Sequence, residues 1–245
     1  MISVCIPTFN GERYILSQLL SILPQLNTDD EIIISDDGST DRTLVLIASL
    51  KDPRIKLIQH AYKRKEKFRY MYTTRNLENA LKHAKGDYIF LADQDDIWTE
   101  NKVEILLGYL EKYTLVLSDC VVVDQDNGVI HSSYFELNGS RPGIVKNLLK
   151  NSYLGCCMAF RSSLLAKLMP ISLFNVPHDI WIGLLAEKFG TVAFANQKLV
   201  RYRRHEQNVS PSGGVSGNSL AYKFIYRYKI LTAYLKRLYQ IKTKA

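Results

Sequence analysis

Residues 87–96 read Asp-Tyr-Ile-Phe-Leu-Ala-Asp-Gln-Asp-Asp, so a short apolar run is followed at once by acidic side chains. The apolar run is typical of a strand buried inside a sheet. Asp is favoured in turns and at helix N-termini, so the acidic cluster is expected to end the strand. Two similar units precede it. Residues 3–7 lead into Thr8-Phe9-Asn10-Gly11, and residues 31–35 lead into Asp36-Asp37-Gly38-Ser39.

Helical patterns separate these expected strands. Apolar residues recur at helical spacing over residues 12–23, and residues 41–50, 74–85 and 99–112 are also expected to be helical. Strands that alternate with helices of this length predict an α/β fold, with a mostly parallel, Rossmann-like sheet covered by helices on both faces. Further along the chain, strands are expected over residues 115–123, 153–160, 191–195 and 199–203, and a helix over residues 179–189.

Composition limits the class of protein. The chain has 245 residues, of which 47% are apolar and 23% charged, which suits one large domain or one domain with an appendage. Disordered and collagen-like classes are excluded. No run approaches the roughly 20 apolar residues of a membrane span, and no signal peptide is expected. The cysteines lack CxxC spacing, so no disulfide framework or zinc site is expected and a reducing cytosol fits.

Positive charge is concentrated at the C-terminus. Residues 207–245 hold seven Lys and Arg residues and no Asp or Glu, while the rest of the chain is nearly neutral. A nearly neutral body is against DNA as the partner of the domain, and a basic tail indicates a localised anionic partner such as a membrane surface or an RNA. Of these we expect the membrane surface and no nucleic acid. Residues 210–219 have the composition of a flexible linker, and residues 220–245 are expected to form a basic, helical, amphipathic tail.

One side of that helix, expected over residues 219–239, is apolar. We expect this side to lie on an anionic membrane surface, with packing against the body or a second subunit as the alternative. The residues predicted on it are Leu220, Phe224, Tyr228, Leu231, Leu235, Leu238 and Tyr239.

The acidic clusters are expected to meet at one rim, because open parallel sheets bind ligands beyond the carboxyl ends of their strands. Carboxylates that converge there repel one another unless a cation joins them. Asp93, Asp95 and Asp96 therefore favour a divalent metal, Mg²⁺ or Mn²⁺, that bridges to a phosphorylated substrate. Any single Asp could instead cap a helix or form a turn.

The motifs in their order along the chain resemble family 2 glycosyltransferases, and the resemblance covers about residues 2–210. The Asp-Gln-Asp-Asp-Ile-Trp and His-Asp-Ile-Trp variants are most similar to the bacterial rhamnosyltransferase-like branch, which builds surface polysaccharides. The resemblance implies a GT-A catalytic domain over residues 1–209, with a nucleotide-sugar half at about 1–118 and an acceptor half at 119–209. The runs that carry it are residues 3–11, 35–41, 90–98, 155–161, 177–181 and 202–208.

The resemblance also implies roles for individual residues. Asp95, Asp93 and His205 would hold Mn²⁺ or Mg²⁺ on the donor diphosphate, and Asp179 would take the proton from the acceptor hydroxyl. Trp98 and Cys156 could equally belong to the core. The residues implied on the donor side are Pro7, Thr8, Phe9, Asn10, Glu12, Asp36, Asp37, Arg75, Asn76, Asp93, Gln94 and Arg203. Those implied on the acceptor side are Trp98, Cys156, His178 and Trp181.

The implied reaction is an inverting, metal-dependent transfer of a sugar from a nucleotide-diphosphate donor, dTDP-rhamnose or a UDP-hexose. The acceptor would be a growing bacterial surface glycan, lipid-linked or a free oligosaccharide. Such an enzyme would be cytoplasmic and peripherally bound to the inner face of the cell membrane, and a homodimer is left open.

Two alternatives belong to other classes. A nucleotidyltransferase that acts on sugar phosphates would normally carry a Gly-rich loop with Lys or Arg after the first strand, whereas this chain has Pro-Thr-Phe-Asn-Gly-Glu over residues 7–12. A non-catalytic adaptor that binds membrane or RNA through the basic tail would leave the aspartate clusters unexplained.

Overall fold

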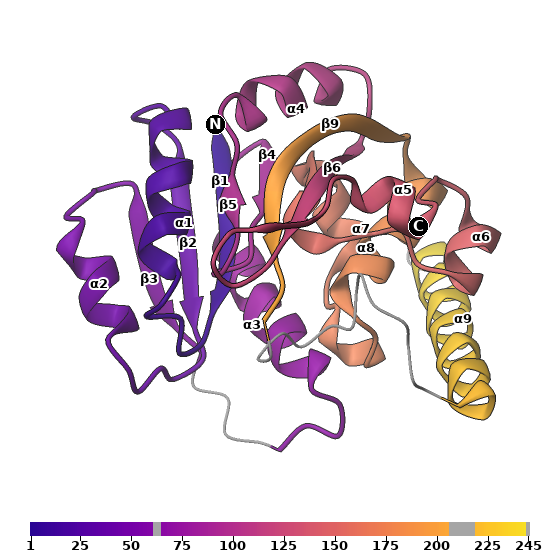
Figure 1. Cartoon of the computed structure of the whole chain (residues 1–245). Helices are drawn as coiled ribbons and strands as arrows, with labels where there is room; N and C mark the ends of the chain where they lie inside the picture. Colours follow the sequence, from indigo (N-terminus) through magenta and orange to yellow (C-terminus); the bar gives the residue numbers. More distant parts are fainter. Residues whose placement is uncertain (61–64, 206–218, 244–245) are drawn as a thin grey trace.

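A computed structural model of the chain describes residues 1–60, 65–205 and 219–243 (Figure 1). Within these residues a nine-stranded sheet runs in the order β3-β2-β1-β4-β8-β6-β9-β5, and β7 pairs with β6 beside this path. The strands are β1 (Ile2–Thr8), β2 (Glu31–Asp36), β3 (Ile55–Gln59), β4 (Tyr88–Leu91), β5 (Ile97–Trp98), β6 (Leu115–Val123), β7 (Val129–His131), β8 (Met158–Arg161) and β9 (Val192–Arg203).

The first half of the sheet is parallel, as the alternating pattern predicts. β1 pairs in parallel with β2 and β4, and β2 pairs in parallel with β3. β8 then runs antiparallel between β4 and β6, and β6 and β9 are parallel again. Every residue of β1 and β2 is buried, which explains why apolar residues are adjacent in both strands and do not alternate with exposed polar ones. The predicted α/β fold is confirmed.

Helices cover the sheet on both faces (Figure 1). α3 packs on β1 and β2, while α4 packs on β6 and β8 and α8 packs on β9. The helices are α1 (Ile15–Ile22), α2 (Thr43–Ser49), α3 (Tyr70–His83), α4 (Lys102–Leu110), α5 (Tyr134–Asn138), α6 (Ile144–Leu149), α7 (Leu165–Leu168), α8 (His178–Phe189) and α9 (Leu220–Lys242). Short 3₁₀ turns are η1 (Leu23–Gln25), η2 (Gly155–Cys157), η3 (Ser162–Leu164) and η4 (Ser172–Phe174).

The second half differs from the sequence-based expectation in detail. The two strands expected over residues 191–195 and 199–203 are one strand, β9, whose register with β6 shifts near Asp119. Within the strand expected over residues 153–160, residues 155–157 form the 3₁₀ turn η2, and strand geometry begins only at Met158. A shift in register of this kind bends a strand, and the turn composition around residues 196–198 reflects that bend.

The C-terminal helix predicted from the sequence is present as α9, which docks on the body through one face. Ile230, Ala233 and Tyr234 are buried there. The Arg237 guanidinium donates to the backbone oxygens of Lys167 and Met169, where α7 ends, so the free carbonyls of that helix gain a cationic donor. Arg237, one of the basic residues of the predicted tail, is therefore buried. None of the described helices has the length and apolarity needed to cross a membrane.

The predicted linker over residues 210–219 lies outside the described residues except at Ser219. Ser219 caps α9, because its side-chain oxygen accepts from the backbone N–H of Tyr222. The division into residues 1–209, 210–219 and 220–245 therefore stays a prediction.

Packing inside α8 supports a prediction about stability. A Cβ at Gly183 would overlap the ring of Tyr153, which is buried. Gly183→Ala should lower the free energy of unfolding by about 1–3 kcal/mol, because overpacking outweighs the gain from alanine in a helix. Gly108 in α4 is the matched control, since a Cβ there meets nothing within 4 Å. Gly108→Ala should stabilise by about 0.5–1 kcal/mol. Urea unfolding that ranks the two variants equally would contradict this packing.

Candidate active site

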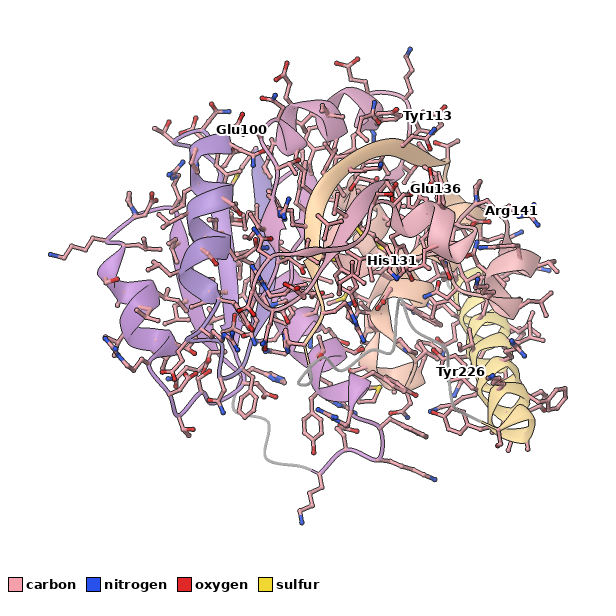
Figure 2. The ribbon with its side chains drawn as sticks, in the orientation of Figure 1. Glu100, Tyr113, His131, Glu136, Arg141 and Tyr226 are labelled. Atoms are coloured by element: carbon pink, nitrogen blue, oxygen red, sulfur yellow. The ribbon has the colours of Figure 1, made fainter. Side chains whose placement is uncertain are left out.

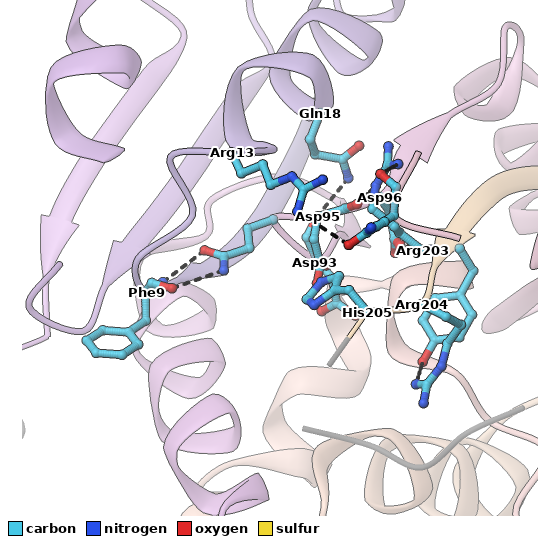
Figure 3. A network of polar contacts seen from close by, with 12 residues as sticks. Phe9, Arg13, Gln18, Asp93, Asp95, Asp96, Arg203, Arg204 and His205 are labelled. Atoms are coloured by element: carbon cyan, nitrogen blue, oxygen red, sulfur yellow. Dashed lines mark hydrogen bonds and ion pairs between the residues drawn. The ribbon is translucent and has the colours of Figure 1, made fainter. Parts of the chain in front are cut away.

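The loops that follow β1 and β4 are joined by one side chain. Gln94 accepts from the backbone N–H of Phe9 at 2.9 Å and donates to the Phe9 carbonyl at 3.0 Å (Figure 3). A Cβ at Gly11 would lie 2.5 Å from Gln94 Oε1, so only glycine permits this approach. The Gln94 contact therefore fixes the first turn against the acidic cluster.

The loops that follow β1 and β2 are joined in the same way. Asn10 receives a hydrogen bond from the backbone N–H of Thr40 at 2.9 Å, and its own N–H donates to Ser39 Oγ. Glu12 accepts from the backbone N–H of Arg42. Asp36 accepts from the N–H groups of Gly38 and Ser39, and so shapes the second turn. These residues set the shape of the rim, and their contact with a donor stays a prediction.

Two residues predicted on the donor side sit deeper. Asn76 on α3 donates to the Thr8 carbonyl at 3.0 Å, and both residues are buried. Pro7 is buried beside Thr8 in β1. Arg75, next to Asn76, pairs with Glu66. The buried set therefore forms the floor under the first turn.

Asp37 faces His60, which follows β3. The Asp37 carboxylate lies 3.1 Å from His60 Nδ1. Burial raises the pKa of Asp37 above its usual range, the charge of Asp36 adds to this effect, and His60 partly offsets it. Burial destabilises the charged form of Asp37, so an N–H group of a bound ligand that donates to this carboxylate would stabilise it.

The acidic cluster after β4 meets the end of β9. Asp95 Oδ2 lies 2.7 Å from His205 Nε2, and Figure 3 shows the two side chains together beside Asp93. The His205 ring stacks on the Tyr14 ring, with 5.2 Å between their centroids. The Arg203 guanidinium lies 4.9 Å from the centroid of the Tyr14 ring. Tyr14 therefore contacts the side chains of both Arg203 and His205 and helps to fix their positions.

Arg203 supports the acidic loop from beneath. Its backbone N–H donates to Asp96 Oδ1 at 2.8 Å, and its guanidinium donates to the carbonyls of Asp95 and Gln125. The residue is only 5% exposed. This geometry gives Arg203 a positioning role, and its predicted contact with a donor diphosphate stays a prediction.

The carboxylates of this cluster carry an electrostatic cost. Burial and the charges of Asp95 and Asp179 raise the pKa of Asp93 to about 8. Burial, with Asp95 and Asp93, also raises the pKa of Asp96 well above its usual range, and Asp96 Oδ2 is buried without a hydrogen-bond partner among the described residues. Concentrated negative charge of this kind is what a bound cation stabilises.

The side chains that could ligate a metal at this rim fit a hard divalent cation. Ligand atoms of Asp93, Asp96 and Cys156 lie within 4.8 Å of one another, and Asp95 and His205 form the adjacent pair. Burial holds the pKa of the Cys156 thiol well above its usual value, so the sulfur stays protonated and is a poor ligand. The oxygen atoms of the carboxylates and one imidazole remain, which suits Mg²⁺ or Mn²⁺.

A further carboxylate, that of Asp179, comes from α8. Asp179 lies in the first turn beside His178, and a Cβ at Gly155 would lie 2.9 Å from His178 Nε2. The next residue after Gly155, Cys156, has its sulfur within 4.8 Å of an Asp93 carboxylate oxygen, which places Asp179 near the acidic cluster. The charge of Asp179 is one of the contributions that raise the pKa of Asp93. Asp179 Oδ1 lies 3.2 Å from His178 Nε2, and His178 Nδ1 lies 3.4 Å from Thr74 Oγ1. If Thr74 donates to Nδ1, then Nε2 carries the proton and lies at ion-pair distance from the Asp179 carboxylate. His178 therefore links Asp179 to Thr74 on α3.

Comparison with known families agrees with this geometry. The family model described as "Glycosyl transferase family 2" matches residues 3–169. The chain belongs to glycosyl transferase family 2.

One similar protein is the UDP-Glc:alpha-D-GlcNAc-diphosphoundecaprenol beta-1,3-glucosyltransferase WfgD of Escherichia coli. It is 26% identical over 214 residues, which cover 86% of this glycosyltransferase and 79% of WfgD. An uncharacterized glycosyltransferase of Rickettsia conorii is 34% identical over 137 residues, which cover 56% of this chain but only 20% of that relative. The chain therefore matches only part of some relatives.

Solved structures show the same fold. TarS 1–349 of S. aureus in complex with UDP has a TM-score of 0.64 at 20% identity, over 83% of this glycosyltransferase and 60% of the TarS 1–349 chain. The glucosyl-3-phosphoglycerate synthase of Mycobacterium tuberculosis, in complex with Mn²⁺, UDP and phosphoglyceric acid, has a TM-score of 0.54 at 21% identity. That match covers 97% of this chain and 78% of the synthase.

Three residues predicted on the acceptor side of the glycosyltransferase are in its core. Trp181 is fully buried, and its indole N–H donates to the Leu168 carbonyl. Trp98 is buried under the ammonium group of Lys102, 4.1 Å from the ring centroid. Cys156 is fully buried as well. Their burial gives these side chains a packing role, and their predicted contact with an acceptor stays a prediction, whereas His178 lies beside Asp179.

Sequence reasoning missed several supporting residues of the glycosyltransferase. Tyr14 contacts His205 and Arg203, and Gln18 donates to the Asp93 carbonyl at 2.9 Å. The four-residue spacing of Tyr14 and Gln18 places them on one face of the first helical segment, and a buried glutamine in an apolar helix was the available signal. His60 and Thr74 carried no such signal, because their partners are distant in sequence.

Proposed function

We propose that this enzyme transfers a sugar, with inversion, from a nucleoside-diphosphate donor to a growing bacterial surface glycan. The observation that carries the proposal is the meeting of two acidic groups at one rim. Asp93 and Asp95, with His205, follow β4 and β9, and Asp179 faces them from α8. An inverting transfer needs charge neutralisation at the leaving group and a base at the acceptor, and this arrangement supplies both.

The donor would lie along the loops after β1, β2 and β4. Asp37 and His60 would contact the base, and Asn10 and Gln94 would hold the turns that enclose the ribose. Asp95, Asp93 and His205 would hold Mn²⁺ or Mg²⁺, and this cation would neutralise the diphosphate as it leaves. The imidazole of His205 favours Mn²⁺ of the two. A UDP-hexose is the first choice of donor, because UDP-Glc is named for WfgD and UDP is bound in TarS. dTDP-rhamnose is the second.

The acceptor would approach from the side of α8. Asp179 would accept the proton of the attacking hydroxyl, and His178 would keep the carboxylate oriented from its place against Thr74. One carboxylate suffices for a single displacement, because no enzyme-bound sugar has to be formed.

A lipid-linked glycan is the proposed acceptor, supported by the diphosphoundecaprenol acceptor named for WfgD. The enzyme would then work peripherally at the inner face of the cell membrane, where such an acceptor is anchored. A free oligosaccharide acceptor and a homodimer remain predictions.

Incubation of the full chain with Mn²⁺ and a panel of UDP-, dTDP- and GDP-sugars tests the proposal. Slow release of free sugar and nucleoside diphosphate from one donor is the expected result. Pyrophosphate release from a nucleoside triphosphate and a sugar phosphate would instead support the nucleotidyltransferase. Turnover of no donor would support the non-catalytic adaptor.

A further inference from the structure

α9 is apolar on two opposite sides, and the fold uses only one of them. The docked side holds Ile230, Ala233 and Tyr234. The other side is exposed and forms what we call the α9 stripe. Its members, spaced by three or four residues along the whole helix, are Phe224, Tyr228, Leu231, Leu235 and Tyr239.

This stripe is most of the apolar side predicted from the sequence. The alternative in which that side packs on the catalytic domain is wrong for these residues. Leu238 alone is half-buried at the edge of the docked side, and the side chain of Leu220 is outside the description. The body therefore leaves this apolar side of α9 uncovered.

Basic residues border the α9 stripe on both sides. At 100° per residue, Lys223 and Arg227 fall along one edge, and Lys229 and Lys236 fall along the other. The helix contains no acidic residue to balance them. Long basic side chains beside an apolar stripe can extend their charges into the headgroup layer while the stripe contacts acyl chains. Of these four residues, Lys229 instead lies against the body, with its ammonium group 3.9 Å from the centroid of the Phe68 ring. Tyrosine, which the stripe carries twice, favours the same boundary.

α6 extends this surface. Arg227 donates from Nε to the Leu149 carbonyl at 2.9 Å, so the end of α6 lies against α9. Val145 and Leu149 are exposed on α6, beside a shallow hollow that Lys146 and Lys150 also line. In Figure 2, Arg141 before α6 and Tyr226 on α9 lie at the same edge of the molecule.

Basic residues gather on and beside α6, because Arg141, Lys146 and Lys150 line the same hollow. Burial, with the charges of Lys150 and Arg141, lowers the pKa of Lys146 below its usual value, and Glu187 partly offsets this effect. A cluster of basic side chains of this kind gains from an anionic surface that lies over it.

We propose that the α9 stripe and the exposed side of α6 form one surface that binds an anionic lipid bilayer. A second copy of this chain fits less well, because a symmetric contact through α9 would bring two acid-free helices together with their cations facing each other. The proposal rests on the proposed function in one respect: a lipid-linked acceptor gives the enzyme a reason to lie on a membrane.

Vesicle flotation with the full chain tests this surface. The intact chain should float with vesicles of phosphatidylglycerol and phosphatidylcholine, and much less with phosphatidylcholine alone. The double variant Phe224→Asp, Leu235→Asp should partition at least about tenfold less, equivalent to about 1.4 kcal/mol. The matched control is Leu20→Asp, Val45→Asp. Leu20 and Leu235 are both 54% exposed, and Val45 on α2 is 63% exposed against 71% for Phe224.

Three outcomes decide the proposal. Loss of flotation in the α9 variant, with flotation retained in the control, supports it. An α9 variant that floats like the intact chain overturns it. So does a change from dimer to monomer, by light scattering, in the α9 variant, because a second copy then covers the stripe. Donor hydrolysis in solution is measured in parallel. Both variants should retain it, and flotation without hydrolysis would count against the proposed function only.

Discussion

Asp95→Ala should reduce donor turnover more than about 100-fold while the protein stays folded. Mutation of residues that only support metal ligands typically lowers metal affinity or activity by about 10–100-fold. We expect a larger loss when a ligand itself is removed. Asp95 is placed for this role by its 2.7 Å contact with His205 and by its position in the loop after β4. The measurement is release of free sugar from the donor in Mn²⁺, with circular dichroism as the check on folding.

Asp87→Ala is the matched control for this variant. Asp87 precedes β4 as Asp95 follows it, and its side chain is exposed beside the N-terminal amine. The control should keep full turnover. Normal turnover in Asp95→Ala would remove Asp95 from the proposed metal site.

Asp179→Asn should leave nucleotide binding intact and reduce transfer by about 10²–10⁴-fold, the range that general base catalysis contributes. The amide keeps the shape of the side chain and its contact with His178 but cannot accept the acceptor proton. Calorimetry with UDP and a transfer assay on the same preparation separate the two effects. An equal loss of nucleotide binding and transfer would make Asp179 a structural residue of the α8 N-terminus.

The parallel half of the fold could be predicted because its signals are local. In β1, β2 and β4 an apolar run is followed directly by turn-forming polar residues, and hydrogen bonding of Asp36 to the next N–H groups needs no distant partner. The predicted C-terminal helix was likewise local, since its apolar spacing and the cap at Ser219 are both within the segment.

The remaining features depend on contacts distant in sequence. Tyr14 contacts Arg203 and His205 only because β9 returns beside β5. The docked side of α9 could not be identified from the helix alone, because both sides are apolar. The choice is made by α7, whose end supplies the carbonyls that accept from Arg237. Trp181 next to a motif residue predicted a sugar contact, whereas its helix turns that ring towards Phe174 in the core.

Equilibrium binding of UDP to the full chain, with Mn²⁺ and then with EDTA, tests most directly whether the rim of Asp93, Asp95 and His205 binds a nucleoside diphosphate together with a divalent cation. UDP should bind at least about tenfold more tightly in Mn²⁺, a gain of about 1.4 kcal/mol, and UMP, which lacks the second phosphate, should gain much less. An affinity for UDP that is the same in Mn²⁺ and EDTA would contradict the account.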